Sequence, residues 1–265
     1  MFLEYSNLLF EKSGNVAVVA FNRPTSANAI NLDLAREFSD AIRICAEDPA
    51  IRAVVLRGEG KLFCAGGDLR DFGAQPPAQL AGYLERVTHF LHRAITTLAH
   101  MSSPIIAAVH GSAAGAGFSI ACACDFVIAA ESAKFTMAYT KAALTPDGSS
   151  TYFLPRIVGF KKALELAISN TVLSADEAQA LGIVTRVVPD ADVVAAATAM
   201  ATELAAGPTG AYGGVKRLLL ASSSNALEAQ MAREAEWLSS MAKTKDAREG
   251  IAAFLAKRAP KFSGD

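Results

Sequence analysis

The chain has 265 residues, of which 52% are hydrophobic and 19% are charged, and its mean hydropathy is +0.27. This composition excludes a disordered or fibrous protein and suits one large domain, or one domain with an appendage. The formal net charge is −1, so no overall field attracts nucleic acid or an anionic membrane, and an anionic ligand has to be held locally.

Short apolar runs alternate with helical patterns along most of the chain. Buried strands are predicted at 16–21, 53–56, 105–109 and 126–129, because these runs are apolar with little polar alternation. Between the first two strands, apolar residues at helical spacing predict a helix that Asn31 caps at its N-terminus. Strands and helices in this order predict an α/β core.

The end of the chain has only helical patterns. Ser174 and Glu177 have capping-box spacing, and beyond them the strand patterns cease near residue 190. Asp246 is expected to cap the last helix. We therefore expect an α/β region over residues 1–200 and a helical region over 201–265.

The number and spacing of the cysteines indicate the redox compartment and whether a zinc site is present. The four cysteines, Cys45, Cys64, Cys122 and Cys124, are too few for a disulfide framework and lack the ligand pairs of a zinc site, so we expect a reducing cytoplasm and no metal. No basic leader precedes an apolar run at the start of the sequence.

The uncharged stretch 105–124 has the length of a membrane span, but its small residues and glycines would drive insertion weakly. We expect no membrane span.

Three irregular segments place small residues or a turn where backbone can approach a ligand. Residues 63–69 form either a tight turn capped by Asp68 or a loop whose N–H groups face an oxygen. Residues 110–119 follow a strand and expose N–H groups at a helix N-terminus, which suits a developing negative charge. Residues 144–150 contain a Pro-Asp-Gly turn, in which Asp147 is either a solvated turn carboxylate or a functional one.

Other interpretations of the second segment were weighed. A dinucleotide-binding fingerprint fails because Ile120 stands at the third glycine position. A hydrolase nucleophile at Ser119 fails because His110 is the last histidine of the chain. Close packing of a helix on a sheet stays open as an alternative. His89 and His92 have helical spacing but no evident third ligand, so we expect an ordinary helix there.

Taken in order and spacing, these segments resemble the crotonase superfamily, the enoyl-CoA hydratase/isomerase family. Each motif alone is weak, but together they cover nearly the whole chain. The matching motifs are Phe21-Asn22-Arg23-Pro24, Asn28-Ala29-Ile30, Ala65-Gly66-Gly67-Asp68-Leu69, Pro104 to Gly111, Cys124-Asp125-Phe126, Leu173 to Ala178, Leu181 to Val184, Arg248-Glu249-Gly250 and Phe254 to Arg258.

The resemblance implies a crotonase-like spiral of ββα units over residues 1–200, followed by helices at 201–265 that build homotrimers, often paired into hexamers. It implies an acyl-CoA thioester substrate from fatty acid metabolism or aromatic degradation. It implies no cofactor beyond the coenzyme A of the substrate, and no nucleic-acid partner.

The resemblance also assigns an oxyanion hole to the backbone N–H groups of Gly67 and Ala116. Such a donor is typically worth about 2.7–4 kcal/mol in the transition state. Many relatives have glycine where Ala116 stands, but only its N–H is needed. The two glutamates of hydratases fall on Ser119 and Tyr139, whose hydroxyls are too weakly basic to activate water. A two-glutamate hydratase is therefore not expected.

Asp147 lies in a segment that resembles the one in which Δ3,Δ2-enoyl-CoA isomerases and the ring-epoxide isomerase of phenylacetyl-CoA breakdown carry a single carboxylate. One base suffices for a 1,3-proton shift. The resemblance places coenzyme A against the backbone near 27–30 and 65–69, with Arg70 and a neighbouring subunit's Lys257 near its phosphates. The expected substrate-binding residues are Arg23, Ala27, Ala29, Ile30, Ala65, Gly66, Asp68, Leu69, Arg70 and Lys257.

Three alternatives to the isomerase stay open. The first is a hydratase with other acid and base groups. The second is a hydrolase or dehalogenase in which a carboxylate attacks the substrate. The third is a non-catalytic protein that binds coenzyme A.

Overall fold

The computed structural model describes residues 5–265, which fold around a six-stranded sheet of order β1-β2-β3-β4-β6-β9. β1 pairs antiparallel with β2, and the other pairs in this sheet are parallel. A three-stranded sheet of order β5-β7-β8 accompanies it. The strands are β1 (Leu8–Ser13), β2 (Val16–Phe21), β3 (Ala53–Gly58), β4 (Ile105–Val109), β5 (Ser112–Ala114), β6 (Phe126–Ala130), β7 (Lys134–Thr136), β8 (Leu173–Ser174) and β9 (Arg186–Val188).

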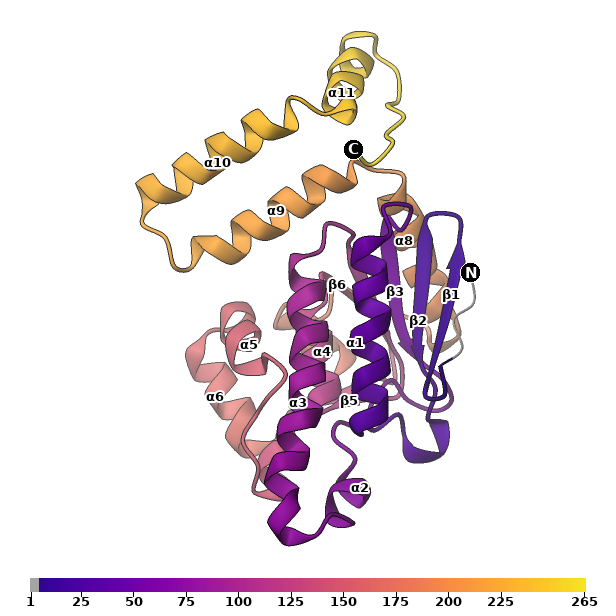
Figure 1. The fold of residues 1–265 in the computed structure, drawn as a ribbon, viewed down its shortest axis with the longest axis vertical. Coiled ribbons are helices and arrows are strands. Elements are labelled where there is room, and N and C mark those ends of the chain that lie inside the picture. The colour runs from indigo at the N-terminus through magenta and orange to yellow at the C-terminus, as the bar shows by residue number, and fades with distance from the viewer. Residues whose placement is uncertain (1–4) are drawn as a thin grey trace.

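Helices cover both faces of the large sheet. α1 and α3 pack side by side in front of it, and α8 packs behind it against β3 and β4 (Figure 1). The α-helices are α1 (Leu32–Glu47), α2 (Leu69–Gly73), α3 (Pro77–His100), α4 (Ala116–Ala123), α5 (Ser150–Val158), α6 (Phe160–Ser169), α7 (Ala175–Ala180), α8 (Val193–Ala205), α9 (Thr209–Ser222), α10 (Leu227–Met241) and α11 (Lys245–Leu255). Short 3₁₀ helices are η1 (Pro24–Ser26), η2 (Tyr139–Ala142) and η3 (Asp190–Asp192).

The chain winds as a spiral in which each turn contributes a strand to the large sheet and a second extended segment beside it. Parallel pairing joins Ile30 to Gly67 and Cys64 to Ala113, and β5 then pairs with β7. Both glycine-containing loops therefore belong to successive turns of the spiral. This winding brings residues 65–67 next to residues 113–116.

The expected α/β class and the main elements are confirmed. The four predicted strands are present, the Asn31 side chain accepts a hydrogen bond from the Leu34 N–H at 3.0 Å, and Ser174 and Glu177 form a capping box. The cap predicted at Asp246 is wrong, because Thr244 accepts the capping bond from Ala247. The buried Asp246 carboxylate instead accepts hydrogen bonds from the backbone of the C-terminal tail.

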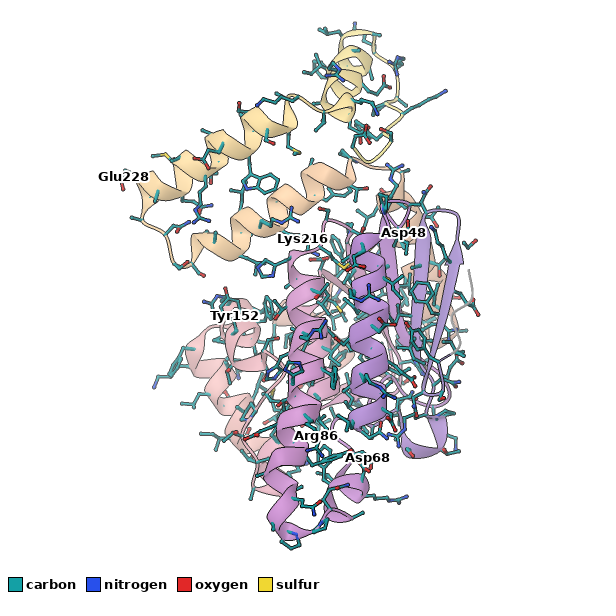
Figure 2. All side chains as sticks on the ribbon, in the orientation of Figure 1. Asp48, Asp68, Arg86, Tyr152, Lys216 and Glu228 are labelled. Atoms are coloured by element: carbon teal, nitrogen blue, oxygen red, sulfur yellow. The ribbon has the colours of Figure 1, made fainter. Side chains whose placement is uncertain are left out.

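The last three helices extend away from the sheet (Figure 1). Two cations, the partly buried Lys216 and the buried Arg52, connect this region to the core. Lys216 of α9 lies between that helix and the core, where it pairs with Asp125 at 2.7 Å (Figure 2). Burial raises the pKa of Asp125, and Lys216 opposes that rise. The buried Arg52 guanidinium donates to the Gly207 and Phe262 carbonyl oxygens at 2.6 and 3.1 Å. The boundary set at residue 200 falls inside α8, which packs on the sheet.

Within residues 5–265, no helix combines the length and apolar character that a membrane crossing requires.

Close contacts between the two glycine loops leave no room for side chains. A Cβ on Gly66 would lie 2.9 Å from the Ala114 carbonyl oxygen, and Gly66 has a φ of +101°. A Cβ on Gly117, in the first turn of α4, would lie 2.5 Å from the Cys64 carbonyl oxygen. These glycines therefore set how closely α4 approaches the loop at residues 63–67.

We expect Gly117→Ala to lower the free energy of unfolding by about 1–3 kcal/mol, because the added methyl overlaps backbone that cannot rotate away. Urea denaturation measures this change. Gly82→Ala on α3 is the matched control, since only the tip of Arg86 lies within 4 Å of its new Cβ. That control should gain about 0.5–1 kcal/mol from helix propensity. Equal stability of Gly117→Ala and wild type would show that the contact at Gly117 can relax.

Candidate functional site

A cavity of about 260 Å³ lies where the two glycine loops, α3 and the segment after β7 meet. Most of its wall is apolar, and the exceptions are backbone groups and a few hydroxyl and carboxylate oxygens. The lining residues are Ile30, Ala65, Gly66, Gly67, Leu69, Phe72, Leu84, Val87, Thr88, Leu91, Gly115, Ala116, Ala138, Tyr139, Ala142, Leu144, Thr145 and Asp147.

Two backbone N–H groups in this wall have no acceptor among the described residues. Ile30 pairs with the residues on either side of Gly67, donating to the Gly66 carbonyl at 2.7 Å and accepting from the Asp68 N–H at 3.0 Å. The Gly67 N–H is therefore left out of that pairing. Ala116 is the first residue of α4, so its N–H has no partner within the helix. Both N–H groups belong to residues that line the cavity, as an oxyanion hole requires.

Asp147 lines the same cavity, with its carboxylate joined to a chain of hydroxyl groups. The Tyr139 hydroxyl donates to Asp147 Oδ1 at 2.6 Å, and it lies 2.8 Å from Ser119 Oγ. The side chain of Asp147 is 26% exposed, so it is not the fully solvated turn carboxylate that the sequence left open. Burial, and then the charge of Asp147, raise the pKa of Tyr139 well above its usual range. The phenol therefore stays protonated and acts as a donor.

Ser119 and Tyr139, the residues expected at the glutamate positions of hydratases, lie next to each other, and Tyr139 contacts Asp147. Ser119 is fully buried, and its Oγ also lies 3.2 Å from the Gly115 carbonyl oxygen. Together, Ser119, Tyr139 and Asp147 connect the predicted base with the peptide whose N–H belongs to Ala116.

His92 is a site neighbour that the sequence analysis assigned to an ordinary helix. Its Nε2 lies 3.8 Å from Asp147 Oδ2 and accepts a hydrogen bond from the Gly148 N–H at 3.3 Å. Leu84, Thr88 and Leu91 of the same helix line the cavity. Continuing this face by one turn reaches His92, so the helical period carried a signal that was not used.

The expected coenzyme A residues divide into a buried group and an exposed group. Arg23 pairs with Asp68 at 2.9 Å and also donates to the Ala29 carbonyl oxygen. These contacts tie residues 23–30 to the loop that ends in α2. Ala65, Leu69 and Arg70 are exposed beside this region, while Ala29, Ile30, Gly66 and Asp68 are buried and Ala27 is half-buried.

Lys257 lies away from that group. It lies two residues beyond the end of α11, and α11 is at the opposite end of the molecule from α2, the helix that contains Arg70 (Figure 1). Within one chain, Arg70 and Lys257 are therefore not brought together.

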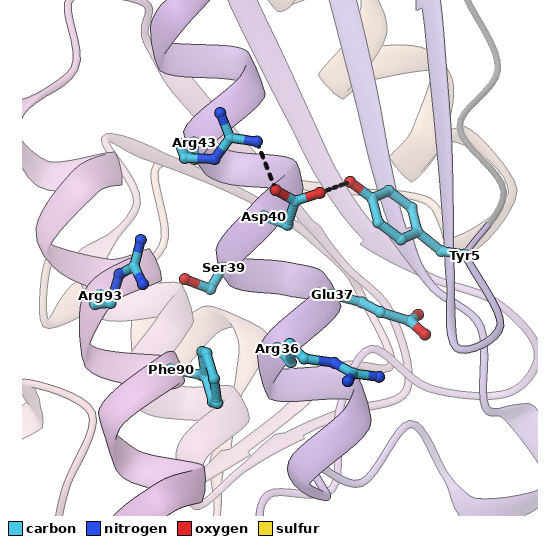
Figure 3. A pocket seen from close by; sticks show the side chains of 8 residues that line it. All are labelled: Tyr5, Arg36, Glu37, Ser39, Asp40, Arg43, Phe90 and Arg93. Carbon is cyan, nitrogen blue, oxygen red and sulfur yellow. Dashed lines mark hydrogen bonds and ion pairs between the residues drawn. The ribbon is translucent and has the colours of Figure 1, made fainter.

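A larger hollow, of about 430 Å³, lies between α1 and α3 (Figure 3). Its walls are mostly charged, and Asp40 within it accepts hydrogen bonds from Tyr5 at 2.7 Å and Arg43 at 2.6 Å. None of the site residues predicted from the sequence lines this hollow. Five of its eight lining residues are charged, so it suits an acyl group less well than the mostly apolar cavity does.

Nucleophilic thiols and metal clusters do not add to the site. Cys64 is fully buried, and burial raises the pKa of its thiol to about 12, so it packs as a small apolar side chain. Among residues 5–265, no group of three or more His, Cys, Asp or Glu side chains is placed to hold a metal ion.

The chain matches known proteins over almost its whole length. A family model described as enoyl-CoA hydratase/isomerase matches residues 11–265. A probable enoyl-CoA hydratase of Rhodobacter capsulatus is 39% identical over 262 residues, covering 99% of this chain and 100% of the relative. The 1,2-epoxyphenylacetyl-CoA isomerase of Escherichia coli is 36% identical over 249 residues, covering 94% and 95%. The crystal structure of an enoyl-CoA hydratase from Polaromonas sp. JS666 aligns with a TM-score of 0.89 at 35% identity, covering 96% of this chain and 98% of that chain.

The expected spiral fold is confirmed by this structural match, which includes the C-terminal helices. The relatives carry names of different reactions, so membership fixes the class of enzyme and leaves the reaction open. Because the family model matches residues 11–265 of this chain, the chain belongs to the enoyl-CoA hydratase/isomerase family of the crotonase superfamily.

Proposed function

We propose that this enzyme is an acyl-CoA isomerase that uses Asp147 as its single acid and base. One observation carries the proposal: among the described residues that line the cavity, Asp147 is the only carboxylate, and the cavity wall also contains Gly67 and Ala116. A base and an oxyanion hole that share one apolar cavity suit the formation of a thioester enolate.

In the proposed reaction, Asp147 removes a proton from C2 of a 3-enoyl-CoA. The electron pair of that C–H bond forms a C1–C2 double bond, and the π pair of the carbonyl moves onto the thioester oxygen, where the Gly67 and Ala116 N–H groups stabilise the negative charge. The enolate then collapses as Asp147 returns the proton to C4, so the double bond moves from C3–C4 to C2–C3. The same enolate chemistry serves a ring-epoxide isomerisation of a phenylacetyl-CoA derivative.

The hydroxyl groups at the glutamate positions support an isomerase over a hydratase. Adding water needs a group that activates the water and a group that delivers a proton. The Tyr139 phenol is held in its protonated form, and Ser119 is buried against it. Neither can replace a carboxylate base, whereas a proton shift needs only one.

A second candidate, hydrolysis or dehalogenation through attack by Asp147, is favoured by one contact. His92 Nε2 lies 3.8 Å from Asp147 Oδ2. An imidazole beside a nucleophilic carboxylate can activate the water that would cleave an ester intermediate, once its Nε2 exchanges the Gly148 N–H for that water. The two candidates differ in whether Asp147 forms a covalent bond.

We further propose that the phosphates of coenzyme A lie near the exposed Arg70, and that a second copy of the chain supplies Lys257. The C-terminal helices leave large apolar side chains exposed, as expected for surfaces that pack between copies in a homotrimer or a dimer of trimers. These exposed side chains are Leu227, Met231, Leu238, Ile251, Phe254 and Leu255.

Proton exchange at C2 of a 3-enoyl-CoA and of a saturated acyl-CoA in deuterated water tests the isomerase proposal. Asp147→Asn should lower exchange about 10²–10⁴-fold, because it removes the base. Acyl-CoA binding, measured by calorimetry, should change much less. Full exchange in Asp147→Asn would overturn the assigned role, and no exchange in the wild type would favour the nucleophilic or the non-catalytic alternative.

Labelled water separates the isomerase from the hydrolase. After turnover in H₂¹⁸O with a 3-enoyl-CoA or a halogenated aromatic acyl-CoA, the peptide that contains Asp147 should carry no ¹⁸O, since an isomerase never makes an ester to this carboxylate. Mass spectrometry of the digested protein measures the label. Incorporation at Asp147 would establish the nucleophilic mechanism.

Arg70→Ala should raise the dissociation constant for acyl-CoA about two- to tenfold, with a larger effect at low salt, because an exposed cation is screened by ions. Arg36→Ala is the matched control, since Arg36 is an exposed arginine on α1 that lines the other hollow. Identical binding by Arg70→Ala, Arg36→Ala and wild type would remove Arg70 from the proposed phosphate site.

A further inference from the structure

The hydroxyl chain at Asp147 contains more contacts than protons. Three contacts connect Asp147 Oδ1, the Tyr139 hydroxyl, Ser119 Oγ and the Gly115 carbonyl oxygen, at 2.6, 2.8 and 3.2 Å. Two hydroxyl groups supply only two protons. One of the three contacts therefore carries no hydrogen, and the neighbouring groups decide which one.

The Gly115 carbonyl is the acceptor that can do without a hydroxyl proton. It already accepts the backbone N–H of Ser119 at 3.0 Å. The ionised Asp147 carboxylate has no proton, so it can only accept, and the Tyr139 proton points to it. The Ser119 proton is then free for the Tyr139 oxygen. The hydrogen bonds of this hydroxyl chain therefore all run in one direction: Ser119 donates to Tyr139, and Tyr139 donates to Asp147 Oδ1. Each donor polarises the next.

The second carboxylate oxygen lacks such a donor. His92 Nε2 is the polar atom that faces Oδ2, and their separation of 3.8 Å exceeds a hydrogen bond. The same Nε2 accepts the Gly148 N–H, so in this arrangement its lone pair is directed to that backbone group. Tyr139 and His92 are thus the titratable groups that face Asp147, and they contact different oxygens.

We propose that Ser119 and Tyr139 are positioning residues that hold Oδ1 of Asp147 and leave Oδ2 as the oxygen that moves the substrate proton. This inference rests on the isomerase function proposed above. The hydroxyls of Ser119 and Tyr139, at the expected glutamate positions, thereby orient the carboxylate of Asp147. The Tyr139 donor stays in place while Oδ2 gains and loses its proton.

The backbone around Asp147 supports a fixed carboxylate. The Asp147 carbonyl oxygen accepts hydrogen bonds from the Ser150 N–H and hydroxyl at 3.2 and 3.0 Å. Gly148 has a φ of +59°, and a Cβ there would lie 3.1 Å from Ser119 Cβ. The turn is therefore packed directly against the residue that begins the hydroxyl chain.

Kinetics of Tyr139→Phe test the inference. We expect kcat for C2 proton exchange to fall about ten- to hundredfold, with a smaller change in KM, because a hydrogen bond to a charged group is lost while the shape of the side chain is kept. The acid limb of the pH profile should move up by about one pH unit, since the carboxylate loses a donor to its charged form. Ser119→Ala should act in the same direction with an effect of about two- to fivefold.

Tyr152→Phe is the matched control, because Tyr152 lies on α5 outside this cavity, with its hydroxyl 3.5 Å from the Leu220 carbonyl oxygen. It should keep the wild-type kcat and pH profile. A Tyr139→Phe enzyme with wild-type kcat and an unmoved acid limb would overturn the inference. So would a loss of activity without any movement of that limb, which indicates a merely structural role.

A titration without substrate supplies a second readout. The ultraviolet signal of tyrosinate in the wild type, minus that of Tyr139→Phe, isolates the Tyr139 phenol. In the Asp147→Asn background this phenol should ionise at lower pH, because the carboxylate charge that opposes ionisation is gone.

Different outcomes overturn the proposed function and the positioning role of Tyr139. If Asp147→Asn keeps full exchange, the proposed function fails, whatever Tyr139 does. If Asp147→Asn loses exchange while Tyr139→Phe keeps both the wild-type kcat and the acid limb, only the positioning inference fails.

Discussion

The close approach of two backbone turns underlies the whole site. Gly66 packs against the peptide between Ala114 and Ala116, and a Cβ at Gly66 would lie 2.9 Å from the Ala114 carbonyl oxygen. Only glycine allows this contact at a φ of +101°. Because the spiral stacks these turns, the N–H groups of residues 67 and 116 reach one cavity without the help of any side chain. Their positions therefore depend on the packing of the core.

This constraint explains why the side chains at the site can vary while the site survives. Ala116 contributes its backbone N–H to the cavity, so its methyl group does not alter the donor. In the function proposed above, Ser119 and Tyr139 stand where hydratases carry glutamates, and their hydroxyls form contacts that run from the Gly115 carbonyl to Asp147. On that proposal the site lacks the two acids that would activate water. The surviving hydroxyls are well placed to serve the one carboxylate that the cavity contains.

Much of the fold and part of the site could be predicted from the sequence. Buried strands such as 105–109 are apolar at every position, and Asn31 caps its helix as local chemistry predicts. The strands of the small sheet have two or three residues each, too few to show a period. Long-range contacts also escaped prediction. Spacing along the chain does not reveal that the buried Asp246 binds the C-terminal tail 17 residues later, or that His92 faces a turn 56 residues away.

A single carboxylate in an apolar cavity places a limit on the chemistry of this enzyme. In the proposed mechanism, the proton that Asp147 removes leaves it either for the substrate or for water, since the Tyr139 phenol beside it is already protonated. The acid form of Asp147 is then the donor that protonates the enolate. Asp147 is 26% exposed and the neighbouring His92 is 51% exposed, so water reaches the carboxylate from the side of α3. Return of the proton to the substrate therefore competes with its exchange into solvent. The rigid hold on Oδ1 favours return, because it keeps Oδ2 aimed at the substrate while the enolate persists.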